Sequence, residues 1–262
     1  MSQNSSDSAD VVESDRKRII KLRVILALAF PLWVYLSFLT AQIITIGLLR
    51  AVEYMNVPVQ SLNENIFSSV VSVFIYAVTV CITIGLPWII KRKKISLADI
   101  GLQRLPSFGD MGIAPAGLIV YFVFSSLLIF TASAIFPWFD AGQAQDTGFS
   151  LLSTRYEYIL AFVTLVIIAP FAEEILFRGY LYGQLRKTVP VWVAVLIASL
   201  LFGAIHGAWN LAFDTFALSI VLCVLRETTG SLWASVLLHM IKNGIAFYIL
   251  FINPLLFNTL GA

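Results

Sequence analysis

Long apolar runs separated by short polar segments dominate the pattern of this chain. Seven such runs can be drawn, at residues 24–49, 67–90, 112–136, 157–181, 190–208, 211–225 and 232–252. A helix needs about 20 apolar residues to span a bilayer, and the run at 211–225 is the shortest of the seven. The pattern therefore predicts an all-α polytopic bundle of about seven transmembrane helices.

Composition supports a membrane protein. Hydrophobic residues make up 59% of the 262 residues and charged residues only 12%, whereas soluble domains carry about 25% charged residues. An ordinary soluble domain is thereby excluded. The lipid bilayer is the first expected partner, and no nucleic-acid partner is expected.

The distribution of basic residues predicts the orientation. Lys and Arg collect in short cytoplasmic loops. With the N-terminus inside, the tail, the segment 91–107 and the two later inner loops hold thirteen basic residues, and the outer loops hold only Arg50 and Arg155. The sequence therefore predicts an integral multi-pass protein with a cytoplasmic N-terminus, in the plasma membrane if the organism is prokaryotic.

Three regions are expected along the chain. Residues 1–23 combine a Ser- and Asp-rich start with a basic cluster, so a disordered, basic cytoplasmic tail is predicted. Residues 24–136 hold three spans without ionisable residues and are interpreted as a scaffold or a lateral wall for substrate. Residues 155–252 carry all the intramembrane charges, and such charges indicate a functional site.

The segment 169–178, Ala-Pro-Phe-Ala-Glu-Glu-Ile-Leu-Phe-Arg, carries the most charge at membrane depth. Residues four apart share a helix face, so Glu174 and Arg178 are predicted to pair. Glu173 points about 100° away and has no such partner. Pro170 cannot donate a backbone hydrogen bond, which frees space near the carboxylates. The bland interpretation, a buried pair that only fixes helix packing, leaves Glu173 unexplained.

Two further pairs lie on later spans. Phe202 and His206 are four residues apart, as are His239 and Asn243, so each pair shares a helix face. Asn210 also follows a histidine by four residues, but it is placed at the outer surface, where water satisfies its amide. Asp214 and Lys242 are weaker candidates.

These residue types suit hydrolysis of an amide within the membrane. A carboxylate can act as general base on water, an imidazole can orient that water, and a second imidazole with an amide can stabilise an oxyanion. One Glu and two His could equally hold a catalytic zinc with one water, and the metal ligands would then be Glu173, His206 and His239. No cofactor is favoured, and zinc stays possible.

The expected depths of the candidate residues in the membrane do not agree. At about 1.5 Å per helical residue, Glu173 and His239 fall within roughly 5 Å of the membrane midplane, on its cytoplasmic side. His206 falls roughly 9 Å toward the outside if its helix starts at Val191. Convergence of the three therefore requires that helix to be tilted, bent or set deeper.

The order Glu-Glu-x-x-x-Arg, Phe-x-x-x-His and His-x-x-x-Asn on successive late spans resembles the CAAX prenyl endopeptidase and bacteriocin-processing family, called CPBP or Abi. The similarity covers roughly residues 155–250 and includes the run 229–233, Thr-Gly-Ser-Leu-Trp. It implies an α-helical intramembrane endopeptidase acting on a membrane-embedded or lipid-associated peptide or protein.

The resemblance also implies roles for individual residues. Glu173 would be the general base, with His206 helping to activate water, while His239 and Asn243 would form the oxyanion site. Supporting positions would be Glu174, Arg178 and Phe202. Glutamate-type chemistry is favoured over a metalloprotease. Two other classes stay open: a non-catalytic immunity or scaffold protein, and a proton-coupled transporter.

Overall fold

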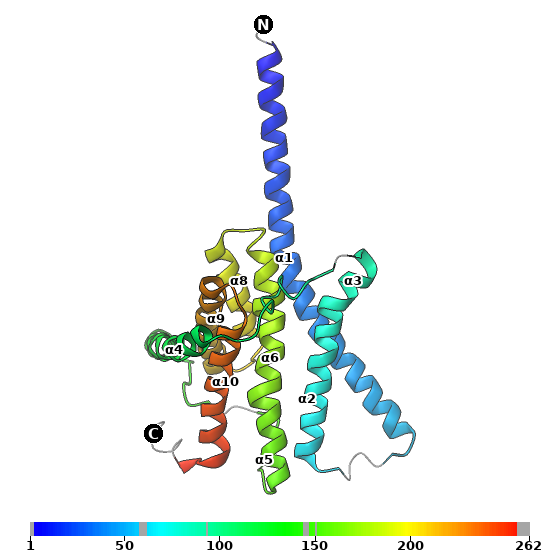
Figure 1. Cartoon of the computed structure of the whole chain (residues 1–262), viewed down its shortest axis with the longest axis vertical. Helices are drawn as coiled ribbons and strands as arrows, with labels where there is room; N and C mark the ends of the chain where they lie inside the picture. The colour runs from blue at the N-terminus through cyan, green and yellow to red at the C-terminus, as the bar shows by residue number, and fades with distance from the viewer. Residues whose placement is uncertain (1–2, 58–61, 93, 144–146, 150, 256–262) are drawn as a thin grey trace.

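The computed structural model describes residues 3–57, 62–92, 94–143, 147–149 and 151–255 (Figure 1). Lys93, one of the basic residues counted in the loop 91–107, lies outside this part. Every regular element among the described residues is a helix, so the predicted all-α bundle of about seven helices is confirmed. The α-helices are α1 Gln3–Tyr54, α2 Glu64–Val80, α3 Leu86–Lys91, α4 Phe108–Ile135, α5 Arg155–Phe162, α6 Ala169–Glu174, α7 Tyr182–Leu185, α8 Val191–Ala204, α9 Trp209–Thr229 and α10 Trp233–Phe247.

Four π-helical stretches join some of these elements end to end. They are η2 Cys81–Gly85, η3 Val163–Ile168, η4 Ile175–Leu181 and η5 Tyr248–Ile252. As a result, α5, η3, α6, η4 and α7 form one continuous helix over Arg155–Leu185, which we call the motif helix. Figure 1 shows its α6 segment between α2 and α10.

Within the described residues, five helices are long and apolar enough to cross a membrane: Glu13–Tyr54, Glu64–Ile90, Phe108–Ile135, Arg155–Leu185 and Trp233–Ile252. The full-length spans predicted at 190–208 and 211–225 are not among them. The α8 helix has 14 residues and so extends about 21 Å, less than the roughly 30 Å hydrocarbon core. The α9 helix has 21 residues but carries Asp214, Arg226 and Glu227.

His206 and Glu173 line one cavity, although α8 begins at Val191, the start from which the sequence places His206 farther outside. The last helical residue of α8 is Ala204, so His206 lies in the turn that follows. Gly207 then reverses the chain with φ +79°, a conformation that glycine adopts without steric cost. The imidazole can therefore meet the middle of the motif helix.

The first helix extends far beyond the bundle at its N-terminal end (Figure 1). Its 52 residues correspond to about 78 Å. It changes direction where it reaches the bundle, and Pro31 lies within the helix, where it removes one backbone hydrogen bond and bends the axis. Residues 3–23, for which the sequence predicts disorder, continue this helix, because extending a nucleated helix costs little.

Glu157 joins the first turns of α2 and the motif helix. Its carboxylate accepts hydrogen bonds from Asn63 Nδ2 and Asn65 Nδ2, each at 3.0 Å, and from the Ser153 N–H at 2.9 Å. Thr154 caps the same helix by accepting from the Glu157 N–H. This cluster fixes how α2 lies along the motif helix.

The segment that precedes α4 is hydrogen-bonded to the start of α10. Gly101 accepts the Leu232 N–H at 2.8 Å, and the Arg104 carbonyl accepts Trp233 Nε1 at 2.7 Å. Gly101 has φ +84°, a backbone conformation that favours glycine. In the same segment, hydrogen bonds from Ser96 and then Lys187 lower the pKa of Asp99 to about 2.

Candidate functional site

The motif helix changes its backbone pairing immediately before the two glutamates. In η3 the Ala169 N–H donates to the Thr164 carbonyl, five residues earlier. The same pairing would match the Leu165 carbonyl with residue 170, but Pro170 has no N–H to donate. Asn243 Nδ2 from α10 donates to this carbonyl instead, at 2.9 Å. The proline therefore creates the acceptor that fixes the Asn243 side chain.

Glu174 holds two side chains with one oxygen. Its Oε1 accepts from Arg178 Nη1 at 2.8 Å, which confirms the predicted pair, and lies 2.8 Å from His239 Nδ1. The side chains of Glu174 and Arg178 are fully buried. The contact with His239 is not visible in the sequence spacing. Glu174 thus connects the motif helix to the imidazole on α10.

Glu173 faces away from this pair. Its Oε1 accepts a hydrogen bond from the Tyr76 hydroxyl of α2 at 2.5 Å, and its Oε2 lies 3.8 Å from His239 Nε2. The side chain is 14% exposed, compared with 0% for Glu174. The two adjacent carboxylates therefore have different environments: Glu174 is neutralised by an arginine, and Glu173 borders open space.

His206 presents one ring nitrogen to that space. Its Nδ1 lies 2.6 Å from the Phe202 carbonyl, and a carbonyl oxygen can only accept, so Nδ1 carries a proton. In the neutral ring Nε2 is then an acceptor. The predicted stacking is confirmed, because the ring centroids of Phe202 and His206 are 4.9 Å apart. The Arg178 guanidinium also contacts Phe202, with Cζ 4.3 Å from the centroid of the Phe202 ring.

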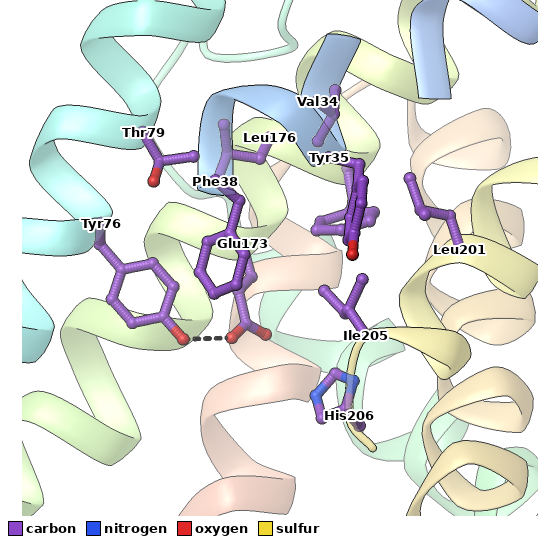
Figure 2. A pocket seen from close by; sticks show the side chains of 11 residues that line it. Val34, Tyr35, Phe38, Tyr76, Thr79, Glu173, Leu176, Leu201, Ile205 and His206 are labelled. Atoms are coloured by element: carbon purple, nitrogen blue, oxygen red, sulfur yellow. Dashed lines mark hydrogen bonds between the residues drawn. The ribbon is translucent and has the colours of Figure 1, made fainter. Parts of the chain in front are cut away.

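Two cavities meet at Glu173 and His206. The first, about 150 Å³, lies between α1, α2 and the motif helix, and Figure 2 shows Glu173 between Tyr76 and His206. The second, about 190 Å³, lies on the α10 side and is also lined by His239 and Asn243. Each is large enough for several water molecules. Glu173 and His206 therefore line both cavities, and His239 and Asn243 line the second.

The structure separates the two asparagines. Asn243 lines the second cavity, whereas Asn210 lies at the start of α9 and donates to the carbonyls of Ala141 and Gln143, at 3.2 and 2.9 Å. Asn210 is only 6% exposed. The prediction that water satisfies its amide is wrong, because the segment 141–143 covers it.

Asp214 is held by side chains of two other helices, and its own side chain is 19% exposed. It accepts hydrogen bonds from Tyr121 and Ser125 of α4, both at 2.6 Å, and lies 3.4 Å from Lys242 Nζ. Lys242 lines the second cavity, but Asp214 does not line it. This pair connects α4, α9 and α10 beside the site.

The candidate zinc ligands do not form a metal site in this arrangement. Among the described residues, no group of three or more His, Cys, Asp or Glu side chains is placed to hold a metal ion. Glu173 and His239 approach to 3.8 Å, while the Glu173 oxygen nearest α2 is bonded to Tyr76.

The hydrogen bond between Tyr76 and Glu173 is another contact that the sequence did not predict. Tyr76 is one of nine tyrosines in the chain and lies in a span without charged residues, so no spacing rule distinguishes it. The available signal is weak: a tyrosine in an apolar helix needs a hydrogen-bond partner for its hydroxyl. That partner comes from a helix 97 residues further along the chain.

Comparison with known proteins agrees with the motif resemblance. Residues 155–245 match the family model described as type II CAAX prenyl endopeptidase Rce1-like. This segment contains Glu173, Glu174, His206, His239 and Asn243. The resemblance inferred from the motifs is therefore confirmed over the second half of the chain.

Individual bacterial proteins are also similar to this chain. An uncharacterized 24.3 kDa protein of Escherichia coli is 38% identical over 32% of this chain and 41% of its own length. The putative membrane peptidase YdiL of Bacillus subtilis is 25% identical over 40% and 43%. The membrane-embedded CAAX protease MroQ of Staphylococcus aureus is 24% identical over 40% and 44%. The matches thus span less than half of these three relatives. No solved structure matches the chain significantly.

Proposed function

We propose that this protein is an intramembrane endopeptidase that hydrolyses a peptide bond in a membrane-associated peptide or protein. The observation that carries the proposal is the position of Glu173 and His206, which line both cavities. A peptide that occupies the two cavities passes the Glu173 carboxylate, which lines both. The family match and the printed names of two relatives support protease activity.

In the proposed mechanism, Glu173 Oε2 takes a proton from a water that His206 Nε2 orients. The resulting hydroxide attacks the peptide carbonyl, and the negative charge on its oxygen faces His239 Nε2 and Asn243 Nδ2. Asn243 uses one N–H for the Leu165 carbonyl and keeps the second for this oxyanion, because an amide has two. Glu173 then returns its proton to the departing amine.

This mechanism specifies the charge of His239. Its Nδ1 faces the Glu174 carboxylate, which can only accept a hydrogen bond. Nε2 therefore donates to an oxyanion only if the ring carries both protons. Glu174 stabilises that imidazolium, and so supports the oxyanion site without touching the substrate.

The direct test is cleavage of a peptide library by the purified full-length protein in lipid nanodiscs, analysed by mass spectrometry. We expect internal cleavage products at one preferred sequence. A transporter or a non-catalytic scaffold would release none.

The proposal favours a water activated by Glu173 and His206 over a zinc-bound water. Cleavage is therefore expected to change less than about twofold after chelation with EDTA or phenanthroline and removal of the chelator. Metal content of the active sample would be measured in parallel. Stoichiometric zinc, with activity lost on chelation and restored by zinc, would overturn this part of the proposal.

Replacing Glu174 by glutamine is expected to cost stability and to leave partial activity. The change leaves the buried Arg178 without a charged partner, and breaking such a pair costs about 3–5 kcal/mol. Asp99→Asn is the control, since Asp99 pairs with Lys187 at 3.1 Å on the surface, with side chains 37% and 57% exposed; such pairs contribute about 0–1 kcal/mol. Thermal unfolding of both variants in one detergent gives the comparison. A stable but inactive Glu174→Gln would exchange the roles of the two glutamates.

A further inference from the structure

Tyr76 makes the shortest side-chain contact that Glu173 has among the described residues. The hydroxyl donates to Glu173 Oε1 at 2.5 Å (Figure 2). Hydrogen bonds from a hydroxyl to a carboxylate are about 2.5–2.7 Å long and roughly twice as strong as those between neutral groups. The ring itself lines the first cavity beside Thr79 and Phe38.

Hydrogen bonds near both ends of its helix fix the position of Tyr76. The α2 helix is held against the motif helix by Asn63 and Asn65, which donate to Glu157. Beyond the other end of α2, in η2, the Thr83 carbonyl accepts a hydrogen bond from Trp33 Nε1 of α1 at 3.1 Å. The tyrosine hydroxyl therefore reaches Glu173 from a helix that is held at both ends.

The contact distinguishes the two oxygens of Glu173. Tyr76 occupies Oε1, while Oε2 is the oxygen nearer to His239 Nε2, at 3.8 Å. A carboxylate without this bond can rotate about its terminal torsion, which is broad for glutamate. With the bond in place, one oxygen is held and the other faces the region where both cavities meet.

We propose that Tyr76 is a positioning residue that holds Glu173 so that Oε2, rather than Oε1, takes the proton from water. This inference rests on the proposed peptidase function and adds to it a residue from the N-terminal three-span region. It also gives that region a part in the chemistry besides enclosing the site.

Tyr182 offers a matched control outside both cavities. Its hydroxyl, on α7, donates to the Glu227 carboxylate at 2.5 Å, which is the same kind of contact at the same length. Neither Tyr182 nor Glu227 lines the cavities at Glu173. Tyr76→Phe and Tyr182→Phe thus remove the same atom from the same kind of contact, and only the first removes a contact with Glu173.

Both variants would be assayed on one cleaved peptide, with rates expressed per folded protein from size-exclusion chromatography and thermal unfolding. Tyr76→Phe is expected to lower kcat by about 10–100-fold, a large part of the roughly 10²–10⁴-fold supplied by a positioned base. Its KM should stay within about twofold, because the hydroxyl does not bind substrate in this proposal. Tyr182→Phe should keep kcat within about twofold.

Three results would count against the inference. Equal kcat values for the two variants would show that Tyr76 does not act through Glu173. A raised KM with unchanged kcat would make Tyr76 a substrate-binding residue instead. A wild-type protein that cleaves no peptide would overturn the proposed function itself and this inference with it, whereas the first two results overturn the inference alone.

Discussion

Glu173→Gln is expected to abolish peptide hydrolysis while the protein stays folded. The amide keeps the shape of the side chain, and its oxygen can still accept from Tyr76, but it cannot take a proton from water. Because a positioned general base contributes about 10²–10⁴-fold, the loss should reach at least that range. Initial cleavage rates and thermal unfolding of the purified variant measure both parts of the expectation.

Asp214→Asn is a suitable control for this change. Asp214 is another carboxylate among membrane helices that accepts a tyrosine hydroxyl, from Tyr121 at 2.6 Å. It does not line either cavity at Glu173. We expect this variant to keep at least about a tenth of the wild-type rate, well above the residual rate after loss of the base. Full activity in Glu173→Gln would remove Glu173 from the mechanism.

The second large effect is expected at Asn243. Asn243→Ala should lower turnover by on the order of a hundredfold or more, as loss of one oxyanion donor does elsewhere. The same change leaves the Leu165 carbonyl without its partner, at a cost of about 1–3 kcal/mol for a buried polar group. Turnover therefore has to be read together with the midpoint of thermal unfolding.

Asn210→Ala separates these two effects. Asn210 is 6% exposed and donates to two backbone carbonyls, so its replacement should also cost stability. Asn210 does not line either cavity at Glu173, and turnover per folded molecule should change by less than about threefold. Equal losses of turnover in the two variants, or a larger loss at Asn210, would mean that the oxyanion site is assigned to the wrong helix.

The sequence predicted the local contacts of the site well. Four-residue spacing on a helix determines which side chains share a face, and the contacts of Glu174 with Arg178 and of Phe202 with His206 follow from it. Apolar runs of more than about 20 residues likewise located the five long helices.

Contacts between distant helices were not accessible in this way. The bonds of Tyr76 to Glu173 and of His239 to Glu174 join segments 97 and 65 residues apart, and no periodicity within one helix contains that information. The covering of Asn210 was missed for the same reason, since the segment 141–143 is an irregular loop. The end of α8 at Ala204 was missed because the apolar pattern continues past it.

The buried group formed by Glu174, Arg178 and His239 has a consequence for the solvation energy of the reaction. Transferring one ion from water into a medium of low dielectric constant costs on the order of 20 kcal/mol in the idealised Born calculation. With His239 as an imidazolium, the formal charges of Glu173, Glu174, Arg178 and His239 sum to zero. In the proposed mechanism, the negative charge of Glu173 passes to the hydroxide and then to the oxyanion beside His239. The membrane interior would then accommodate no additional net charge, because the reaction only moves an existing one.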